Sequence, residues 1–277
     1  MSTITAGQEN SHPIEIYYEN YGVGSPVVLL AAYPLSSASW EKQVPALLAA
    51  GHRVIAYDRR GFGRSSRPSQ GYDFDTLASD LNILLTTLNL TDVSLVGDSM
   101  GAGEVIRYFG KYGSKRVRKA VFISTMGPFW LKAEDNLEGW DKSVFDGLKA
   151  SMQQDRPATL RGILNNAHNF DVLGGKLVSE QAIENFWNVA VDASPIAAVK
   201  CFDAWIEDLR QDIPHIDVPT LILHADESDR VLPPAVSSHR MIKLIKDCKF
   251  VEFKDAPHNI QWTHADRVNE ELVSFLQ

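Results

Sequence analysis

The sequence has little cysteine, no long apolar run and no excess of positive charge. Only 2 of its 277 residues are cysteine, which excludes a disulfide framework and a CxxC metal or redox motif. No apolar stretch is long enough to span a bilayer, and the N-terminus lacks the basic and apolar regions of a signal peptide. Lys and Arg number 27 against 35 Asp and Glu, and this net charge of −8 disfavours nucleic-acid binding. We therefore expect a soluble cytoplasmic protein with no membrane or nucleic-acid partner.

Strand-like and helix-like segments alternate in two parts of the chain. Short apolar runs typical of buried strands occur at 27–30, 54–57, 93–96, 117–124, 219–224 and 249–253. Helical patterns occur at 40–50, 73–88, after residue 99, at 234–246 and at 263–276. Alternating strands and helices predict parallel crossovers, and so an α/β fold with a doubly wound, mostly parallel sheet.

Between these two parts the pattern changes. Residues 125–213 contain amphipathic stretches but no convincing buried strand, and prolines stand near both edges of the segment. We predict one discontinuous α/β core, formed by residues 1–124 and 214–277, that is interrupted by a helical lid over 125–213.

A G-x-S-x-G motif, Gly97-Asp98-Ser99-Met100-Gly101, stands between the strand 93–96 and a helical pattern. In that setting the glycines let the strand turn sharply into the helix, and the serine hydroxyl is exposed above the sheet edge. The backbone N–H of Met100 then points at a developing oxyanion. Without the flanking strand and helix, the motif would be only a common Gly-Ser turn. We predict Ser99 as a nucleophile.

A serine hydroxyl needs a base, which in this chain order follows both the serine and an acid. His258 comes directly after the strand 249–253, at the sheet edge where α/β folds meet their ligands. The other histidines lack such a setting and are interpreted as structural or surface residues.

Three carboxylates compete for the role of the orienting acid. Asp226, Glu227 and Asp229 all lie in the loop after the strand 219–224. We favour Asp229, because it precedes the proline that begins the next helical pattern, and Asp226 is the alternative.

The chain resembles the α/β-hydrolase superfamily and, within it, the cofactor-free haloperoxidases (perhydrolases) with their relatives the γ-lactamases and aryl esterases. The resemblance runs almost end to end. It is carried by the motifs at 33–35, 57–63 with 65–66, 71–76, 97–101, 226–233, 256–258 and 262–265.

The resemblance implies a nucleophile at Ser99, an acid at Asp229 and a base at His258, with an oxyanion hole made by the backbone N–H groups of Tyr33 and Met100. It implies no cofactor and no metal. The substrates would be carboxylic esters, lactones or cyclic amides, hydrolysed through an acyl-enzyme, with acyl transfer to hydrogen peroxide as a side reaction. Relatives of this kind are often homo-oligomers.

Three features depart from the family pattern. Ala31-Ala32 stands where a His-Gly pair is usual, so two methyl groups could displace the Tyr33 N–H. Asp98 stands where an aromatic or neutral polar residue is usual. It would either face the site and raise the pKa of the base, or point away and bind backbone amides. The loop that carries the acid is one residue longer than usual.

The lid is rich in aromatic residues, which predicts a mainly hydrophobic acyl pocket. We expect Trp40, Asp98, Phe129 and Trp130 to contact the small-molecule acyl substrate. Two other functions remain open: an enzyme of this fold redirected to another reaction in the same pocket, and a ligand-binding protein that keeps the triad for its shape.

Overall fold

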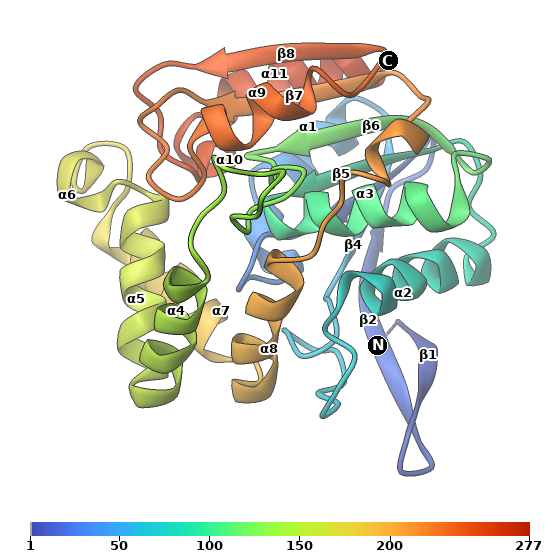
Figure 1. The fold of residues 1–277 in the computed structure, drawn as a ribbon. Helices are drawn as coiled ribbons and strands as arrows, with labels where there is room; N and C mark the ends of the chain where they lie inside the picture. Colours follow the sequence, from blue (N-terminus) through green and yellow to red (C-terminus); the bar gives the residue numbers. More distant parts are fainter. Residues whose placement is uncertain (1) are drawn as a thin grey trace.

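The computed structural model describes residues 2–277 and contains an eight-stranded sheet in the order β1-β2-β4-β3-β5-β6-β7-β8 (Figure 1). The strands are β1 (Thr3–Glu9), β2 (His12–Tyr21), β3 (Pro26–Leu30), β4 (Arg53–Tyr57), β5 (Val93–Asp98), β6 (Val117–Ile123), β7 (Thr220–Ala225) and β8 (Cys248–Phe253). From β4 to β8 every neighbouring pair is parallel, whereas β2 pairs antiparallel with both β1 and β4. The predicted α/β fold with a mostly parallel sheet is confirmed.

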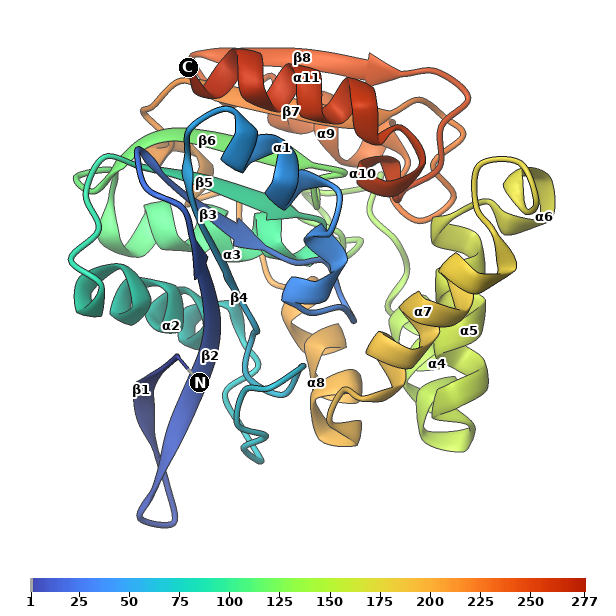
Figure 2. The same cartoon turned by 180° about the vertical axis from the view of Figure 1, so that it is seen from behind.

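Helices cover both faces of the sheet. The core helices are α1 (Gln43–Ala49), α2 (Phe74–Thr87), α3 (Met100–Tyr112), α9 (Ser238–Met241), α10 (Ile260–Thr263) and α11 (Ala265–Leu276). Figures 1 and 2 show α2 and α3 on one face and α1 and α11 on the other. Helices α2 and α3 pack closely, because a Cβ at Gly103 would lie 2.3 Å from the Phe74 ring. The sheet is therefore buried on both sides, as the continuous apolar runs of its central strands require.

Five helices lie between β6 and β7 in the chain. They are α4 (Lys142–Gln154), α5 (Arg156–Ala167), α6 (Phe170–Leu173), α7 (Glu180–Val191) and α8 (Pro195–Trp205). Figure 1 shows them as a group beside the end of the sheet toward which the β8 arrow points. This end carries the loops that follow β5, β7 and β8. We propose that these helices form a lid over those loops, within the range 125–213.

Two details differ from the expected elements. The apolar runs identified in the sequence begin at residue 27 and so omit β1 and β2, although Ile4 and Ala6 alternate inward along β1 and are buried. The single helix expected over 234–246 is wrong. Only a 3-10 turn, Pro234–Val236, and the short α9 form there. Ser237 separates them, and its hydroxyl donates to the Pro233 carbonyl at 2.8 Å, which closes a turn at that point.

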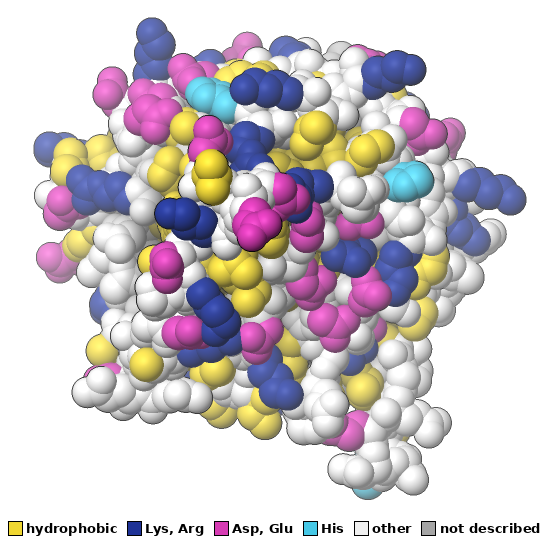
Figure 3. Space-filling view, in the orientation of Figure 1, with side chains coloured by type: hydrophobic (Ala, Val, Ile, Leu, Met, Phe, Trp, Pro, Cys, Tyr) yellow, Lys and Arg dark blue, Asp and Glu magenta, His cyan; other side chains and the backbone are white. Residues whose placement is uncertain are grey.

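The face of the molecule seen in Figure 3 carries basic and acidic side chains interspersed with one another. Across the described part of the chain, residues 2–277, we find no helix with the length and apolar character needed to cross a membrane.

Candidate active site

The turn between β5 and α3 holds Ser99 in a strained conformation. Its backbone angles, φ 50° and ψ −110°, lie in a region that non-glycine residues rarely adopt. Both motif glycines are required by close approach. A Cβ at Gly97 would lie 2.6 Å from the Gly101 carbonyl oxygen, and a Cβ at Gly101 would lie 2.3 Å from the Leu30 carbonyl oxygen. The sharp turn predicted from the motif is therefore present, and Ser99 is partly exposed at its tip.

Three predicted residues from three separate loops come together. His258 Nε2 lies 3.0 Å from Ser99 Oγ, and His258 Nδ1 lies 2.8 Å from Asp229 Oδ2. An ionised carboxylate only accepts hydrogen bonds, so the Asp229 contact places the imidazole proton on Nδ1. The Nε2 lone pair then faces the Ser99 hydroxyl and can take its proton.

The structure places Asp229, and not Asp226, against His258. The second Asp229 oxygen, Oδ1, accepts from the backbone N–H groups of Val231 and Leu232, each at 2.8 Å. Asp226 instead accepts from the N–H groups of Ser228 and Asp255, each at 3.0 Å, which ties the two loops together. Glu227, the third candidate, is exposed.

The surroundings of His258 and Asp229 shift the pKa of each residue. Burial by itself lowers the pKa of His258, but the charge of Asp229, the hydrogen bond to Asp229 and the charge of Asp98 together hold that pKa above its usual value. Burial by itself raises the pKa of Asp229, but His258 and His224 hold that pKa well below the usual range. His224 Nε2 lies 3.3 Å from Asp229 Oδ2, and the His224 side chain is fully buried. The Asp229 carboxylate is thus placed to stabilise the imidazolium form of His258.

A buried arginine holds the loop that carries the predicted oxyanion residue Tyr33. Arg59 Nη2 donates to the Ala31 carbonyl at 2.7 Å, while its Nε donates to Glu104. Glu104 also accepts from the Tyr57 hydroxyl at 2.6 Å. Ala31-Ala32, where a His-Gly pair was expected, is therefore anchored through a main-chain oxygen. Arg59 lies in the motif 57–63, but its contact with Ala31 could not be predicted, because a main-chain acceptor leaves no signal in the residue types.

The two predicted oxyanion donors come from two different segments, the start of α3 and the loop after β3. Met100 is the first residue of α3, so its N–H has no acceptor one turn earlier in the helix. Tyr33 follows β3, and its hydroxyl donates to the Ala198 carbonyl of α8 at 2.7 Å. The oxyanion loop is thus tied to the lid.

Asp98 is buried and directly precedes Ser99 in the chain. Its Oδ2 accepts from the side-chain amide of Gln261 at 2.6 Å, so its partner is a side chain and not the backbone amides considered from the sequence. Burial raises the pKa of Asp98 to about 7, against the opposing charge of His258. Asp98, at the end of β5, is thus linked to α10, which begins two residues after His258.

Replacing Asp98 with asparagine is expected to lower the pKa of the base, because the Asp98 charge favours the imidazolium of His258. The neutral imidazole is the form that accepts the proton from serine. The acid limb of kcat/KM should therefore move to lower pH, by about half a pH unit. The shift is modest, because Asp98 itself loses its charge near pH 7. Profiles from pH 5 to 9 measure it. Asp92→Asn, at the opposite end of β5, is the control, and a limb that moves to higher pH contradicts the assignment.

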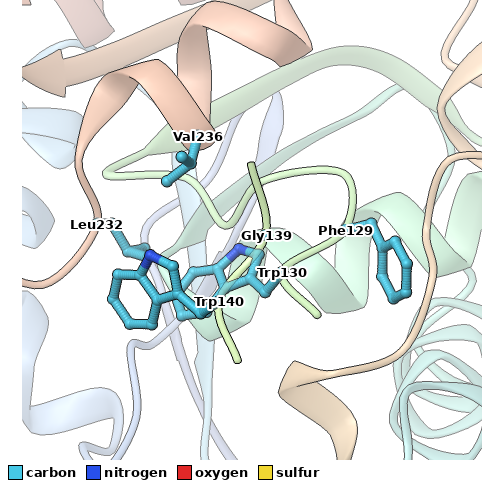
Figure 4. Close-up of a pocket in the computed structure, with 6 residues that line it drawn as sticks. All are labelled: Phe129, Trp130, Gly139, Trp140, Leu232 and Val236. Atoms are coloured by element: carbon cyan, nitrogen blue, oxygen red, sulfur yellow. The ribbon is translucent and has the colours of Figure 1, made fainter. Parts of the chain in front are cut away.

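The residues expected to contact substrate are placed in different surroundings. Trp40 is 1% exposed and belongs to the core cluster that also contains apolar residues of the sheet and α11. Phe129 and Trp130 line a cavity of only about 10 Å³, which has room for at most one water molecule (Figure 4). Figure 4 shows the Phe129 ring pointing away from Trp130 and Trp140. The Phe129 ring lies under the Arg210 guanidinium, 4.9 Å from it.

A larger cavity of about 210 Å³ lies between the lid and the loop after Asp229. Its wall is mostly apolar, and is formed by Trp130, Trp140, Val144, Phe145, Leu148, Ile163, Asn166, Trp205, Arg230 and Val231. Two contacts join it to the site. The Val231 N–H is held by Asp229, and the Trp205 ring packs edge-on against Tyr33 with centroids 5.0 Å apart. Of the residues predicted to bind substrate, Trp130 is the one that lines this space.

Within residues 2–277, no group of three or more His, Cys, Asp or Glu side chains is arranged to hold a metal ion.

The chain is similar to known proteins both in sequence and in structure. Residues 25–265 match the alpha/beta hydrolase fold family. A Synechocystis protein provisionally named a non-heme chloroperoxidase is 52% identical over 277 residues, which is 100% of both chains. The bifunctional esterase/perhydrolase of Acinetobacter calcoaceticus is 33% identical over 95% of this chain and 96% of its own. The crystal structure of bromoperoxidase from Bacillus anthracis superposes with a TM-score of 0.94, at 42% identity over 99% of each chain. This chain belongs to the α/β-hydrolase family and groups there with the non-heme haloperoxidases and perhydrolases.

Proposed function

We propose that this protein is a serine hydrolase that cleaves carboxylic esters through an acyl-enzyme. The observation that carries the proposal is the continuous chain of contacts from Asp229 through His258 to Ser99, at 2.8 and 3.0 Å, ending at a strained turn. A buried structural histidine has no need of a serine held in a rare backbone conformation.

The reaction divides into two proton-coupled steps. In the first, Ser99 Oγ bonds to the substrate carbonyl carbon while its proton passes to His258 Nε2. The Tyr33 and Met100 N–H groups stabilise the oxyanion, and His258 returns the proton to the departing alcohol. In the second step, His258 takes a proton from water and the hydroxide bonds to the acyl carbon. The bond from the acyl carbon to Ser99 Oγ then breaks, His258 returns the proton to Ser99 Oγ, and the acid is released.

The cavity that joins Val231 and Trp205 is the proposed acyl site. Its volume of about 210 Å³ and mostly apolar wall favour a short aliphatic or single-ring acyl group. Lactones and cyclic amides of similar size undergo the same acylation, and we include them in the proposed substrate range.

Hydrogen peroxide is a second proposed acceptor, favoured by the similarity to the esterase/perhydrolase of Acinetobacter calcoaceticus. Peroxide would replace water in the second step. Its oxygen bonds to the acyl carbon, its proton passes to His258, and Ser99 leaves with that proton as the free hydroxyl. The product is a peracid.

A fluorophosphonate probe and a panel of 4-nitrophenyl esters, lactones and lactams test the proposal, each with and without peroxide. Labelling mapped to Ser99 together with turnover is the expected result. Labelling without turnover on any substrate would favour a redirected enzyme or a binding protein. The absence of labelling would contradict the nucleophile assignment. Peracid, detected by its oxidation of bromide, separates perhydrolysis from hydrolysis.

Replacing Ile163 with phenylalanine is expected to shorten the preferred acyl chain. Ile163 lies on α5 in the cavity wall, so a larger side chain removes part of the space. We expect kcat/KM for 4-nitrophenyl hexanoate to fall about tenfold or more, while the value for the acetate changes less than about twofold. The exposed lid variant Val172→Phe controls for a general effect on the lid. Parallel losses on both esters would show that the acyl group binds elsewhere.

A further inference from the structure

A short stretch of the lid touches both loops that carry the proposed acid and base. The stretch is 167–169, which joins α5 to α6. The Asn259 N–H donates to the Ala167 carbonyl at 2.8 Å, and the Asn259 side-chain amide donates to His168 Nε2 at 2.5 Å. The Asn169 amide donates to the Ser228 carbonyl at 2.9 Å. Asn259 and Ser228 are the immediate neighbours of His258 and Asp229.

His168 is held in one protonation state by its partners. It is completely buried, and its Nδ1–H donates to the Leu164 carbonyl at 2.8 Å. A carbonyl only accepts, so Nε2 is left as the acceptor for the Asn259 amide. Burial lowers the pKa of His168 to about 4, which keeps that acceptor available at neutral pH. The ring packs against Phe186, with centroids 4.8 Å apart. Both ring nitrogens are thus used, and neither faces the reacting atoms.

We propose that His168 is a positioning residue that fixes the orientation of the His258 imidazole through Asn259; this inference rests on the proposed role of His258 as the base. The main chain at His258 is held on both sides. Its carbonyl accepts from the Ser124 hydroxyl at 2.5 Å, and the next N–H is bound by Ala167. The Asn259 side chain, bonded to His168, adds a third constraint one residue from the base.

The burial of the contact between His168 and Asn259 argues against a role in lid packing alone. Elsewhere the lid meets the same loops through an exposed pair, Arg230 with Asp171, whose side chains are 43% and 65% exposed. The His168–Asn259 contact is buried, so a lost partner leaves an unpaired polar group inside the protein. A displacement of about 1 Å at a reacting group can cost about 10²-fold in rate.

Three variants test the proposal, with fluorophosphonate labelling rate, kcat and KM as readouts. His168→Leu keeps the size but removes the acceptor, and should lower the labelling rate and kcat about 10- to 100-fold, with KM within about twofold. His168→Gln restores an acceptor for Asn259 and should recover most of both rates. Trp187→Phe removes a different lid hydrogen bond, from Trp187 Nε1 to the Pro157 carbonyl, and should leave both rates unchanged.

A second route covers the case in which His168→Leu does not fold. Asn259→Ala removes the contact from the other side and should give the same loss, and in a foldable double variant the two losses should not add. Equal rates in His168→Leu and the parent, or no recovery in His168→Gln, would overturn the proposal.

A parent protein that shows neither labelling nor turnover would refute the proposed function instead. Hydrogen exchange over residues 255–262 then decides the inference. Faster exchange in His168→Leu than in the parent supports it, and unchanged exchange overturns it.

Discussion

Replacing Ser99 with alanine is expected to lower kcat for 4-nitrophenyl acetate about 10⁵- to 10⁶-fold and to abolish fluorophosphonate labelling. The reason is chemical. His258 remains in place, but no oxygen lies 3.0 Å from its Nε2 to form the acyl-enzyme. The residual rate would come from the oxyanion donors and binding alone.

Ser179→Ala is the matched serine control for this experiment. The Ser179 hydroxyl accepts from the Ala182 N–H at the start of α7, so its loss should cost about 1 kcal/mol of stability and leave turnover intact. Turnover above about 1% of the parent in Ser99→Ala, measured on protein with a native circular dichroism spectrum, would refute the acyl-enzyme mechanism.

Replacing Asp229 with asparagine should lower kcat about 10⁴-fold. Asparagine carries no charge to stabilise the imidazolium, and its amide no longer requires the proton on Nδ1 of His258. The tautomer that presents Nε2 to Ser99 then loses its advantage. Asp229 raises the pKa of His258, so the variant should also have a lower pKa for its base. Its kcat should therefore reach its much lower maximum at a lower pH than in the parent.

Asp226→Asn separates the two carboxylates that the sequence left in competition. Asp226 accepts from two backbone N–H groups, so the amide keeps part of that bonding and the variant should lose stability, about 1 kcal/mol, with activity within a few-fold of the parent. A larger loss of kcat in Asp226→Asn than in Asp229→Asn would reverse the assignment. Thermal melts of both variants distinguish a folding defect from a catalytic one.

Residues in local motifs could be predicted, whereas their supporting contacts could not. Ser99 is identified by five consecutive residues between a strand and a helix. The roles of base for His258 and acid for Asp229 were predicted from their order in the chain and from their positions directly after strands. Their positions after strands that share one sheet edge explain why the loops converge.

The supporting residues are paired across long stretches of chain. Asp98 meets Gln261 at a separation of 163 residues, and His168 meets Asn259 at a separation of 91. Arg59 acts on a carbonyl that every residue type possesses. Such pairs depend on how the lid and loops pack, which residue types and periodicity do not specify.

The split of the helix expected over 234–246 has a local physical cause of a different kind. Ser237 has a hydroxyl that competes for a main-chain carbonyl, and Pro233 supplies it. The hydrophobic pattern of a sequence contains no information on that competition.

The chain leaves the sheet after β6 and returns at β7, so the lid segment lies in sequence between the proposed nucleophile, which follows β5, and the proposed acid, which follows β7. Because the lid is one continuous segment between two strands, it can be exchanged for the lid of a relative without changing the order of the strands. The stretch 167–169 limits that freedom, because it reaches back to the neighbours of both His258 and Asp229. A transplanted lid that lacks equivalents of Ala167, His168 and Asn169 would bring a new pocket to a catalytic centre whose loops have lost their support.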